Sequence, residues 1–207
     1  MHVLPAPDAL DRALPEGHVC LLCGDDTPLT LVLTQALTSR GWRVVLWSPP
    51  ESPEQIPLAL ASVAENHGPI AAYIHINPPD TGDCFSARDE ALLKHTFLMA
   101  KYLKVSLFEA AQHGAAVFVA VTRMDGALGL TGNGSVVAGG LFGLVKTLAL
   151  EWRAAGTQGV FCRAVDIAPT LDVDRAVATL LAELDDPNRR IVEVGWSETG
   201  RVTLSPD

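Results

Sequence analysis

The chain has little basic charge and no long apolar run. It carries 15 Lys and Arg residues against 24 Asp and Glu residues, a formal net charge of -9 among 207 residues, and the basic residues do not cluster in the sequence. This balance disfavours binding to nucleic acid or to acidic membranes. No apolar run approaches the roughly 20 residues that span a bilayer, and residues 1–5 lack a basic region followed by an apolar one. We expect a cytoplasmic protein with neither nucleic acid nor membrane among its partners.

Cysteine is scarce, and its spacing shows no disulfide framework. The four cysteines stand at positions 20, 23, 84 and 162, which indicates a reducing compartment. Cys20 and Cys23 form a C-x-x-C pair, but the pair lies in an apolar run whose side chains alternate between two faces. We therefore interpret both as buried strand residues rather than a redox or zinc pair, and expect no metal site.

Short β-rich runs alternate with longer helical ones, which is typical of a parallel sheet covered on both faces. A hydrophobic content of 48% supports one sizeable core. The alternation predicts a single α/β domain with a Rossmann-like, doubly wound parallel sheet. Strands are predicted at residues 18–23, 43–47, 70–76, 115–122, 160–166 and 191–195, and helices at 29–39, 53–66, 87–112, 135–154 and 173–184.

The two ends of the chain are weakly patterned. Residues 1–17 contain prolines and no clear periodicity, and residues 202–207 follow the last predicted strand and end in Ser205-Pro206-Asp207. We predict a leading linker over 1–17, the sheet domain over 18–201, and over 202–207 a linker toward a following domain. The chain is either an autonomous protein or an excised piece of a longer one.

Glycine is sparse at the turn where a dinucleotide would bind. In a Rossmann-like sheet, glycines after the first strand let backbone N–H groups approach a pyrophosphate. In the turn over residues 23–30, only Gly24 stands at a glycine position, and Pro28 has no N–H. Asp25 and Asp26 would repel phosphates; the repulsion and the missing donor each cost on the order of 1 kcal/mol or more. We expect no tight nucleotide binding, and interpret the two acids as favouring the N-terminus of the helix.

Other polar groups follow the predicted strands. His75 is interpreted as a hydrogen-bonded packing residue that shares a strand face with Tyr73 and Asn77, rather than as a catalytic group. Thr122 supplies a hydroxyl at the end of the fourth predicted strand. After the second strand, residues 48–50 (SPP) offer no group that selects a cofactor, although Arg40 and Arg43 are nearby in the sequence.

Five segments carry a common pattern: 97–104 (FLMAKYLK), 121–126 (VTRMDG), 139–152 (GGLFGLVKTLALEW), 160–169 (VFCRAVDIAP) and 190–196 (RIVEVGW). Together they resemble the structural subdomain of ketoreductases in type I polyketide synthases and polyunsaturated fatty acid synthases. This subdomain is a degenerate, truncated short-chain dehydrogenase/reductase fold, and the resemblance runs from about residue 18 to the C-terminus.

The resemblance implies a subdomain that binds no cofactor and catalyses no reaction. Short-chain reductases place a tyrosine one helical turn before a lysine, so that the ammonium lowers the pKa of the phenol for proton transfer. Phe142 occupies the tyrosine position, and its ring carries no such proton, so Lys146 lacks its partner. Pro28 and Thr30 stand where the family has its other two glycines. The degenerate positions are therefore Phe142 and Lys146 on the helix, and Gly24, Asp25, Pro28 and Thr30 in the loop.

The partners that the resemblance implies are a catalytic ketoreductase subdomain, which this subdomain packs against and stabilises, and neighbouring synthase domains, with an acyl carrier protein in proximity. From the residues alone, Lys146 could instead pair on the surface with Glu151 or Asp125. The apolar stripe of the same helix indicates packing and a candidate partner surface. It consists of Leu141, Leu144, Val145, Leu148 and Trp152.

Two other functions stay open. The first is a divergent NADPH-dependent reductase, in which Lys146 and Thr122 act with Tyr102 or Tyr73; the missing tyrosine before Lys146 argues against it. The second is a docking module for a nucleotide or an acyl carrier protein at the strand-end crevice. Acidic carrier proteins usually need a basic patch, and the sequence indicates none.

Overall fold

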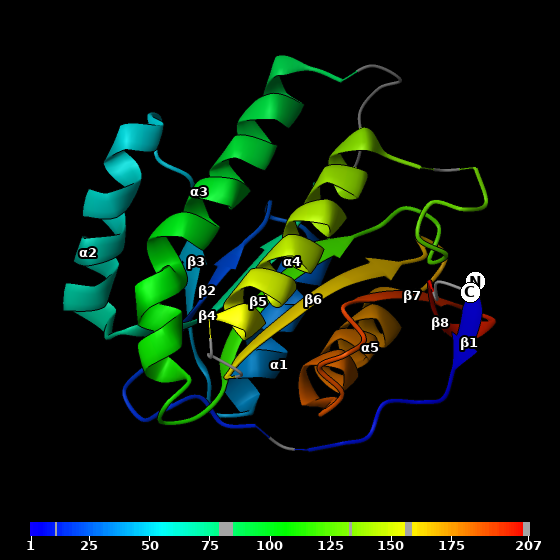
Figure 1. The fold of residues 1–207 in the computed structure, drawn as a ribbon, viewed down its shortest axis with the longest axis horizontal. Coiled ribbons are helices and arrows are strands. Elements are labelled where there is room, and N and C mark those ends of the chain that lie inside the picture. The colour runs from blue at the N-terminus through cyan, green and yellow to red at the C-terminus, as the bar shows by residue number, and fades with distance from the viewer. Residues whose placement is uncertain (11, 79–84, 133, 156–158, 205–207) are drawn as a thin grey trace.

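One eight-stranded sheet forms the centre of the protein (Figure 1). The computed structural model describes residues 1–10, 12–78, 85–132, 134–155 and 159–204. The strand order is β1-β8-β7-β6-β5-β4-β2-β3. Six neighbouring strands are parallel, and β8 and then β1 add antiparallel pairings at one edge. Their bounds are β1 (His2–Leu4), β2 (Val19–Cys23), β3 (Arg43–Trp47), β4 (Ile70–Ile76), β5 (Ala116–Thr122), β6 (Val160–Ile167), β7 (Glu193–Ser197) and β8 (Gly200–Thr203).

Helices cover both faces of the sheet. On one face lie α2 (Ile56–His67), which follows the 3-10 turn η1 (Pro53–Gln55), α3 (Ala87–Ala110) and α4 (Val136–Ala154). On the other face lie α1 (Pro28–Ser39) and α5 (Val173–Asp185) (Figure 1). Every residue of β2, β4, β5 and β6 is buried, because strands covered on both faces contribute side chains to two cores. None of the helices in this described part is long and apolar enough to cross a membrane.

The two cores divide the alternating strand residues between them. Cys23 belongs to the core under α2, α3 and α4, whereas Cys20 belongs to the core under α1 and α5. The prediction that the C-x-x-C thiols point to opposite faces is therefore confirmed. Burial raises the pKa of Cys23 to about 11, so the thiol form dominates at neutral pH. Cys84 lies outside the described residues.

The six predicted strands and five predicted helices all occur. Their ends lie within two residues of the predicted ones, except that α2 begins three residues later than predicted, because residues 53–55 form the 3-10 turn η1. The predicted linkers at the two ends of the chain were wrong in part. His2–Leu4 forms β1 inside the predicted leading linker, and Val202 and Thr203 belong to β8 rather than to a trailing segment. The register pairs His2 with Thr203 and Leu4 with Arg201, so the two ends lie side by side at the sheet edge. Residues 205–207 lie outside the described residues.

A buried network of four charged side chains holds this edge of the molecule. Arg163 on β6 and Arg201 on β8 share two carboxylates, those of Glu183 on α5 and Asp186 after it, and all four side chains are almost completely inaccessible. Arg201 donates from Nε and Nη2 to the two Glu183 oxygens over 2.7 and 2.9 Å. Arg163 Nη1 donates to Asp186 Oδ2 over 2.9 Å. Each buried charge therefore has opposite charges within hydrogen-bond distance, as burial requires.

We predict that Arg163→Met lowers the free energy of unfolding by about 3–5 kcal/mol, because Glu183 and Asp186 are left with one cation for two buried carboxylates. Lys146→Met is the matched control. It breaks an ion pair with Glu193 in which the lysine side chain is 46% exposed, so we expect a loss of about 1 kcal/mol or less. Urea unfolding at pH 7 measures both, and equal losses would contradict the importance of the network.

Candidate functional site

A pocket of about 470 Å³ lies where the carboxyl ends of β2, β3 and β4 meet α3. The chain runs outward from β2 to β3 and then returns to β4 on the other side of β2, so the pocket stands at the topological switch point of the sheet. Doubly wound folds bind their ligands at this position. We call this pocket the strand-end crevice. Its lining includes Gly24, Trp47, His75, Arg88 and His95.

Side chains fill the turn between β2 and α1. Thr27 caps α1, and its Oγ1 accepts the Thr30 backbone N–H over 3.4 Å. Pro28, the first helical residue, has no N–H to offer. A Cβ atom on Gly24 would lie 2.9 Å from Thr30 Oγ1 and 3.2 Å from Ile76 Cβ. The threonine side chain therefore takes up the space that a glycine would leave open for a phosphate.

The two aspartates of this turn precede the helix cap instead of forming it. The capping group is Thr27 and the first turn of α1 contains no acid, so the two acids stand directly before the helix, and their favourable effect on its N-terminus stays a prediction. Asp25 and Asp26 are exposed and line the strand-end crevice. Arg88 on α3 lies 3.7 Å from Asp25, and both side chains are more than half exposed. Two carboxylates thus face the position of a pyrophosphate.

The arginines near the second strand do not reach the strand-end crevice. Arg43 is the first residue of β3 and lies at the opposite end of that strand. Arg40 forms an ion pair with Asp185 at the end of α5. At the tip of β3 the crevice is instead lined by Trp47, Ser48 and Pro49, none of which carries a charge.

Two histidines line the strand-end crevice. The His75 side chain is stacked on Tyr73 with ring centroids 6.3 Å apart, and the residue is 3% exposed. The predicted packing role is in keeping with this burial, but the predicted hydrogen bonds are absent: neither ring nitrogen has a partner among the described residues. Burial, and to a lesser degree His95, lower the pKa of His75 to about 3. Its imidazole is therefore neutral at physiological pH.

His95 was missed in the sequence. It lies on α3, where Nε2 accepts a hydrogen bond from Trp47 Nε1 over 3.1 Å, and burial lowers its pKa to about 4. No local signal links two residues 48 positions apart. Asn77 continues the pairing of β4 with β5, since its N–H donates to the Val121 carbonyl over 2.8 Å. Pro79, the second proline after it, lies outside the described residues.

The loop after β5 is held by a buried carboxylate. The Thr122 hydroxyl donates to Asp166 Oδ1 over 3.0 Å, and the backbone N–H groups of Met124 and Leu128 also donate to Asp166. Burial raises the pKa of Asp166. Thr122 is thus a structural donor, not a hydroxyl directed into an open site. The sequence signal for Asp166 was present: an acid inside the apolar strand over residues 160–167.

A second aspartate closes the same loop. Asp125 accepts from the N–H groups of Ala127, Gly129 and Thr131 over 2.8, 2.8 and 2.9 Å. Although burial opposes the shift, these hydrogen bonds and the one from the Thr131 hydroxyl lower the pKa of Asp125. Gly126 has φ +69, and a Cβ atom there would lie 2.1 Å from the Trp196 carbonyl oxygen. This contact explains why the loop needs glycine at that position.

Helix α4 carries a phenyl ring one turn before its lysine. Phe142 is 5% exposed and belongs to the core under α3 and α4. One turn later, Lys146 Nζ lies 2.9 Å from Glu193 Oε2 on β7. The predicted pairing of Lys146 with Glu151 or Asp125 was therefore wrong. In the apolar stripe, Leu141, Val145, Leu148 and Trp152 are buried and Leu144 is half-buried, so the stripe is core.

The residues that a divergent reductase would use, Lys146, Thr122, Tyr102 and Tyr73, lie in separate environments. Tyr73 is completely buried in β4 and packs against Phe118, with ring centroids 5.2 Å apart. Tyr102 lies on α3 with the Lys101 ammonium 5.3 Å from its ring centroid. Thr122 is bonded to Asp166 and Lys146 to Glu193. In addition, no group of three or more His, Cys, Asp or Glu residues in the described ranges could hold a metal ion.

Comparison with known proteins identifies the fold. A short-chain dehydrogenase of Leptospira borgpetersenii, crystallised with bound NAD+, has a TM-score of 0.64 at 10% identity, over 93% of this chain and 94% of that chain. An A-type ketoreductase from a modular polyketide synthase and an A1-type ketoreductase give TM-scores of 0.62 and 0.63. The fold is that of a short-chain dehydrogenase/reductase. The predicted fold class is therefore confirmed.

The extent of these matches differs. Both ketoreductases are 19% identical to the chain and match 97% of it, but the match covers only 40% and 39% of their own lengths. In sequence, the chain is 28% identical over 212 residues to one of the subunits of a polyunsaturated fatty acid synthase from Thraustochytrium sp.. That match covers 91% of this chain and 7% of the synthase subunit. No family model matches the chain.

We predict that the protein loses stability as the pH falls below about 6.5, and that His75 contributes to the loss. Its pKa in the folded state is about 3, compared with 6.5 for an unperturbed histidine. Between these values the unfolded chain binds a proton that the folded chain does not, so stability present at neutral pH declines by about 1 kcal/mol per pH unit.

Urea unfolding at pH 7, 6 and 5 tests this prediction. His75→Phe keeps an aromatic ring beside Tyr73 and should make the pH dependence shallower, and the rest of the dependence is then due to His95, whose pKa of about 4 is also below that of an unperturbed histidine. Changing the exposed His113 to Phe should leave the dependence as it is. An unchanged slope in His75→Phe would show that the buried imidazole is not the titrating group.

Proposed function

We propose that the chain is the non-catalytic structural subdomain of a ketoreductase in a polyketide or polyunsaturated fatty acid megasynthase. It packs against the NADPH-binding catalytic subdomain and stabilises it. The observation that carries the proposal is the pair Phe142 and Lys146: the first has no proton to transfer, and the second is bound to Glu193. On its own, the chain is then a cytoplasmic pseudoenzyme without a cofactor, and its partners are the catalytic subdomain and the neighbouring synthase domains.

The comparisons support a place within a larger reductase. The chain matches nearly the whole of a single short-chain dehydrogenase but about two fifths of each ketoreductase chain. More than half of such a ketoreductase is left for a second unit that carries the chemistry. The likeness to part of a polyunsaturated fatty acid synthase supports the synthase context, and acyl carrier proteins belong to such assemblies.

The strand-end crevice supports the absence of a cofactor. Pro28 removes one backbone donor, Thr27 takes the N–H of Thr30, and the Thr30 side chain lies against Gly24. Asp25 and Asp26 place negative charge in the same crevice. A pyrophosphate would meet few backbone donors and two carboxylates, of which only Asp25 has a cation, Arg88, beside it; this is less favourable than the electrostatics of a nucleotide site.

An exposed apolar surface is available for the catalytic subdomain. The outer sides of α3 and α4, which lie next to each other on one face of the sheet (Figure 1), carry Phe97, Val105, Val136 and Leu150 with exposed fractions between 56% and 70%. We call these four residues the α3/α4 face. A Cβ atom at Gly139 or Gly143 would meet nothing within 4 Å, so a partner can approach the α4 backbone closely. In the proposal, the catalytic subdomain covers these four apolar side chains.

A divergent NADPH-dependent reductase is the second candidate, favoured by the persistence of a crevice at the switch point and by the neutral, unpartnered His75 within it. This function needs a proton donor near Lys146 other than a tyrosine at position 142. Because Thr122 and Tyr73 are held in buried structural contacts, the scaffold function accounts for more of the site.

We predict that the chain binds a catalytic ketoreductase subdomain of the same synthase and raises its melting temperature. Val105→Asp together with Leu150→Asp should weaken this association about tenfold or more, because two apolar contacts are replaced by charges that lose water on binding. Sedimentation velocity measures the association, and NADPH-dependent ketone reduction by the catalytic subdomain reports whether its fold is supported.

Leu31→Asp is the matched control, since Leu31 is an exposed leucine on α1, on the opposite face of the sheet. It should leave the association intact. Failure of the unmodified chain to bind at micromolar concentrations would contradict the proposal, and equal weakening by the control would remove the α3/α4 face as the contact surface.

A further inference from the structure

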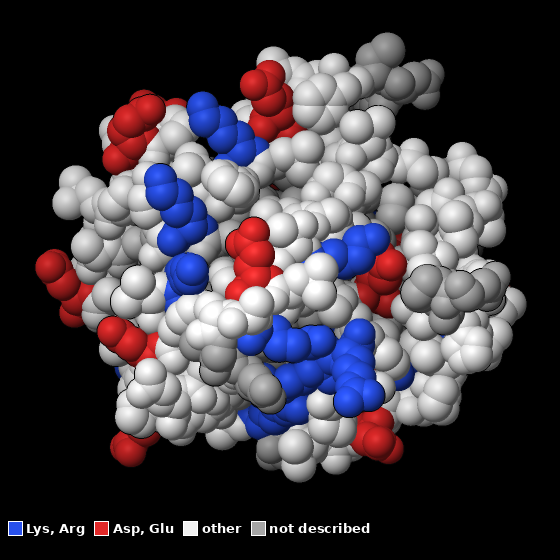
Figure 2. All heavy atoms as spheres, in the orientation of Figure 1, with Lys and Arg blue, Asp and Glu red and all other residues white. Residues whose placement is uncertain are grey.

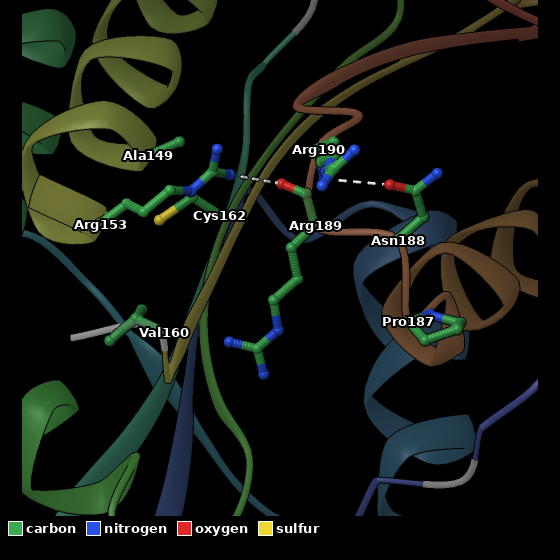
Figure 3. A pocket seen from close by; sticks show the side chains of 8 residues that line it. All are labelled: Ala149, Arg153, Val160, Cys162, Pro187, Asn188, Arg189 and Arg190. Carbon is green, nitrogen blue, oxygen red and sulfur yellow. Dashed lines mark hydrogen bonds between the residues drawn. The ribbon is translucent and has the colours of Figure 1, made fainter. Parts of the chain in front are cut away.

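A second pocket lies at the opposite end of the sheet from the strand-end crevice. It has a volume of about 450 Å³ and is formed by the end of α4, the start of β6 and the segment before β7. Figure 3 shows Arg153 reaching from α4 toward this segment, with Arg189 and Arg190 on the far side. Ala149, Val160 and Cys162 contribute its apolar wall. We call this cavity the arginine pocket.

The arginine pocket concentrates positive charge in an acidic protein. Three of the residues that line it are arginines, and none of the described lining residues is acidic, although the chain as a whole carries a formal net charge of -9. In Figure 2 the largest group of Lys and Arg side chains on this face lies in its lower part, and others are scattered above it. Burial and the nearby Arg12 cation lower the pKa of Arg189. Cations placed this close repel one another, and a bound anion relieves the repulsion.

A buried framework fixes the segment that carries these arginines. Arg163, which is fully buried, donates to the carbonyls of Asn188 and Ile191 on either side of the arginine pair. Asp186 accepts the Asn188 N–H over 2.9 Å, and Asn188 Oδ1 accepts the Arg190 N–H over 3.0 Å. The positions of the two arginines along the backbone are therefore set before any ligand binds, which reduces the entropy lost on binding.

The third cation is tied to the same segment. Arg153 Nη2 donates to the Arg189 carbonyl over 2.8 Å (Figure 3). A guanidinium has five N–H donors, so this single bond leaves Arg153 with donors for a ligand. α4 and the segment before β7 are joined across the cavity by this contact, and all three arginines are among the residues that line it.

We propose that the arginine pocket binds a small organic phosphate. Arginine matches the tetrahedral oxygens of phosphate with paired N–H donors and is weakly hydrated, so it is suited to a partly buried anion site. The apolar wall of Ala149, Val160 and Cys162 accommodates a short organic arm next to the phosphate. The cavity has a volume of about 450 Å³, which suits a small molecule as the ligand. An acidic protein with a flat surface would fit it less well. This site is independent of the proposed scaffold function.

Isothermal titration with inorganic pyrophosphate, at constant ionic strength, tests the proposal. We expect one saturable site per chain, and a loss of affinity of about tenfold or more in Arg190→Gln, because a charge-assisted contact is removed. Arg175→Gln, which changes an exposed arginine on α5, is the matched control and should bind as the unmodified chain does. Circular dichroism confirms that both variants are folded.

Three results would overturn the proposal. The first is the absence of saturable binding by pyrophosphate. The second is an equal loss of affinity in Arg190→Gln and Arg175→Gln, since it would indicate binding by general charge. The third is Arg190-dependent binding of a glutamate-rich peptide without binding of pyrophosphate, which would make this face a docking surface for an acidic protein.

Discussion

The four-residue ion network of Arg163, Glu183, Asp186 and Arg201 is the constraint on which one half of the molecule depends. Placing four charges in a core costs several kcal/mol per ion in lost hydration, and this cost is offset only when every charge is paired and hydrogen-bonded. The network meets this condition by joining β6, β8 and α5. Arg201 Nη1 also donates to the Pro5 carbonyl over 3.3 Å. The segment after β1 is thereby connected to the core.

Several features of the surface follow from this network. Because Arg163 donates to the carbonyls of Asn188 and Ile191, it fixes the backbone between α5 and β7. That backbone carries Arg189 and Arg190 and leads directly into Glu193, the partner of Lys146. The ion pair of Lys146 therefore depends on the backbone that Arg163 holds in place.

The sequence predicted the central sheet because the physical signals there are local. Continuous apolar runs identified β2, β4, β5 and β6, and the helices between them followed from length and periodicity. β1 and β8 were missed because three- and four-residue strands carry too little pattern, and their pairing joins residues 2 and 203. Only the tertiary structure reveals the contacts between residues far apart in the chain. These are the Trp47 to His95 hydrogen bond, the hydrogen bonds to Asp166 and the arginine pocket.

At the candidate site, too, the sequence predicted the local features and missed the tertiary contacts. Residue identity alone predicted that Phe142 and the turn over residues 23–30 depart from a catalytic pattern, and the structure adds how the space is used: Thr30 lies against Gly24, and the Phe142 ring belongs to the core. The predicted ion-pair partners of Lys146 were wrong because the actual partner, Glu193, lies on a different element, β7. A fold does not fix a function, so the scaffold function rests on these residues and not on the fold.

The most direct test of the scaffold function is a titration of the purified chain with NADPH. Nicotinamide fluorescence is followed, and an intact short-chain reductase serves as the positive control. The scaffold function predicts no saturable change up to millimolar concentrations, because Pro28, Thr30 and the two aspartates leave no cradle for a pyrophosphate. Saturable binding at micromolar concentrations would contradict it, and would direct attention to His75 and the strand-end crevice as a working cofactor site.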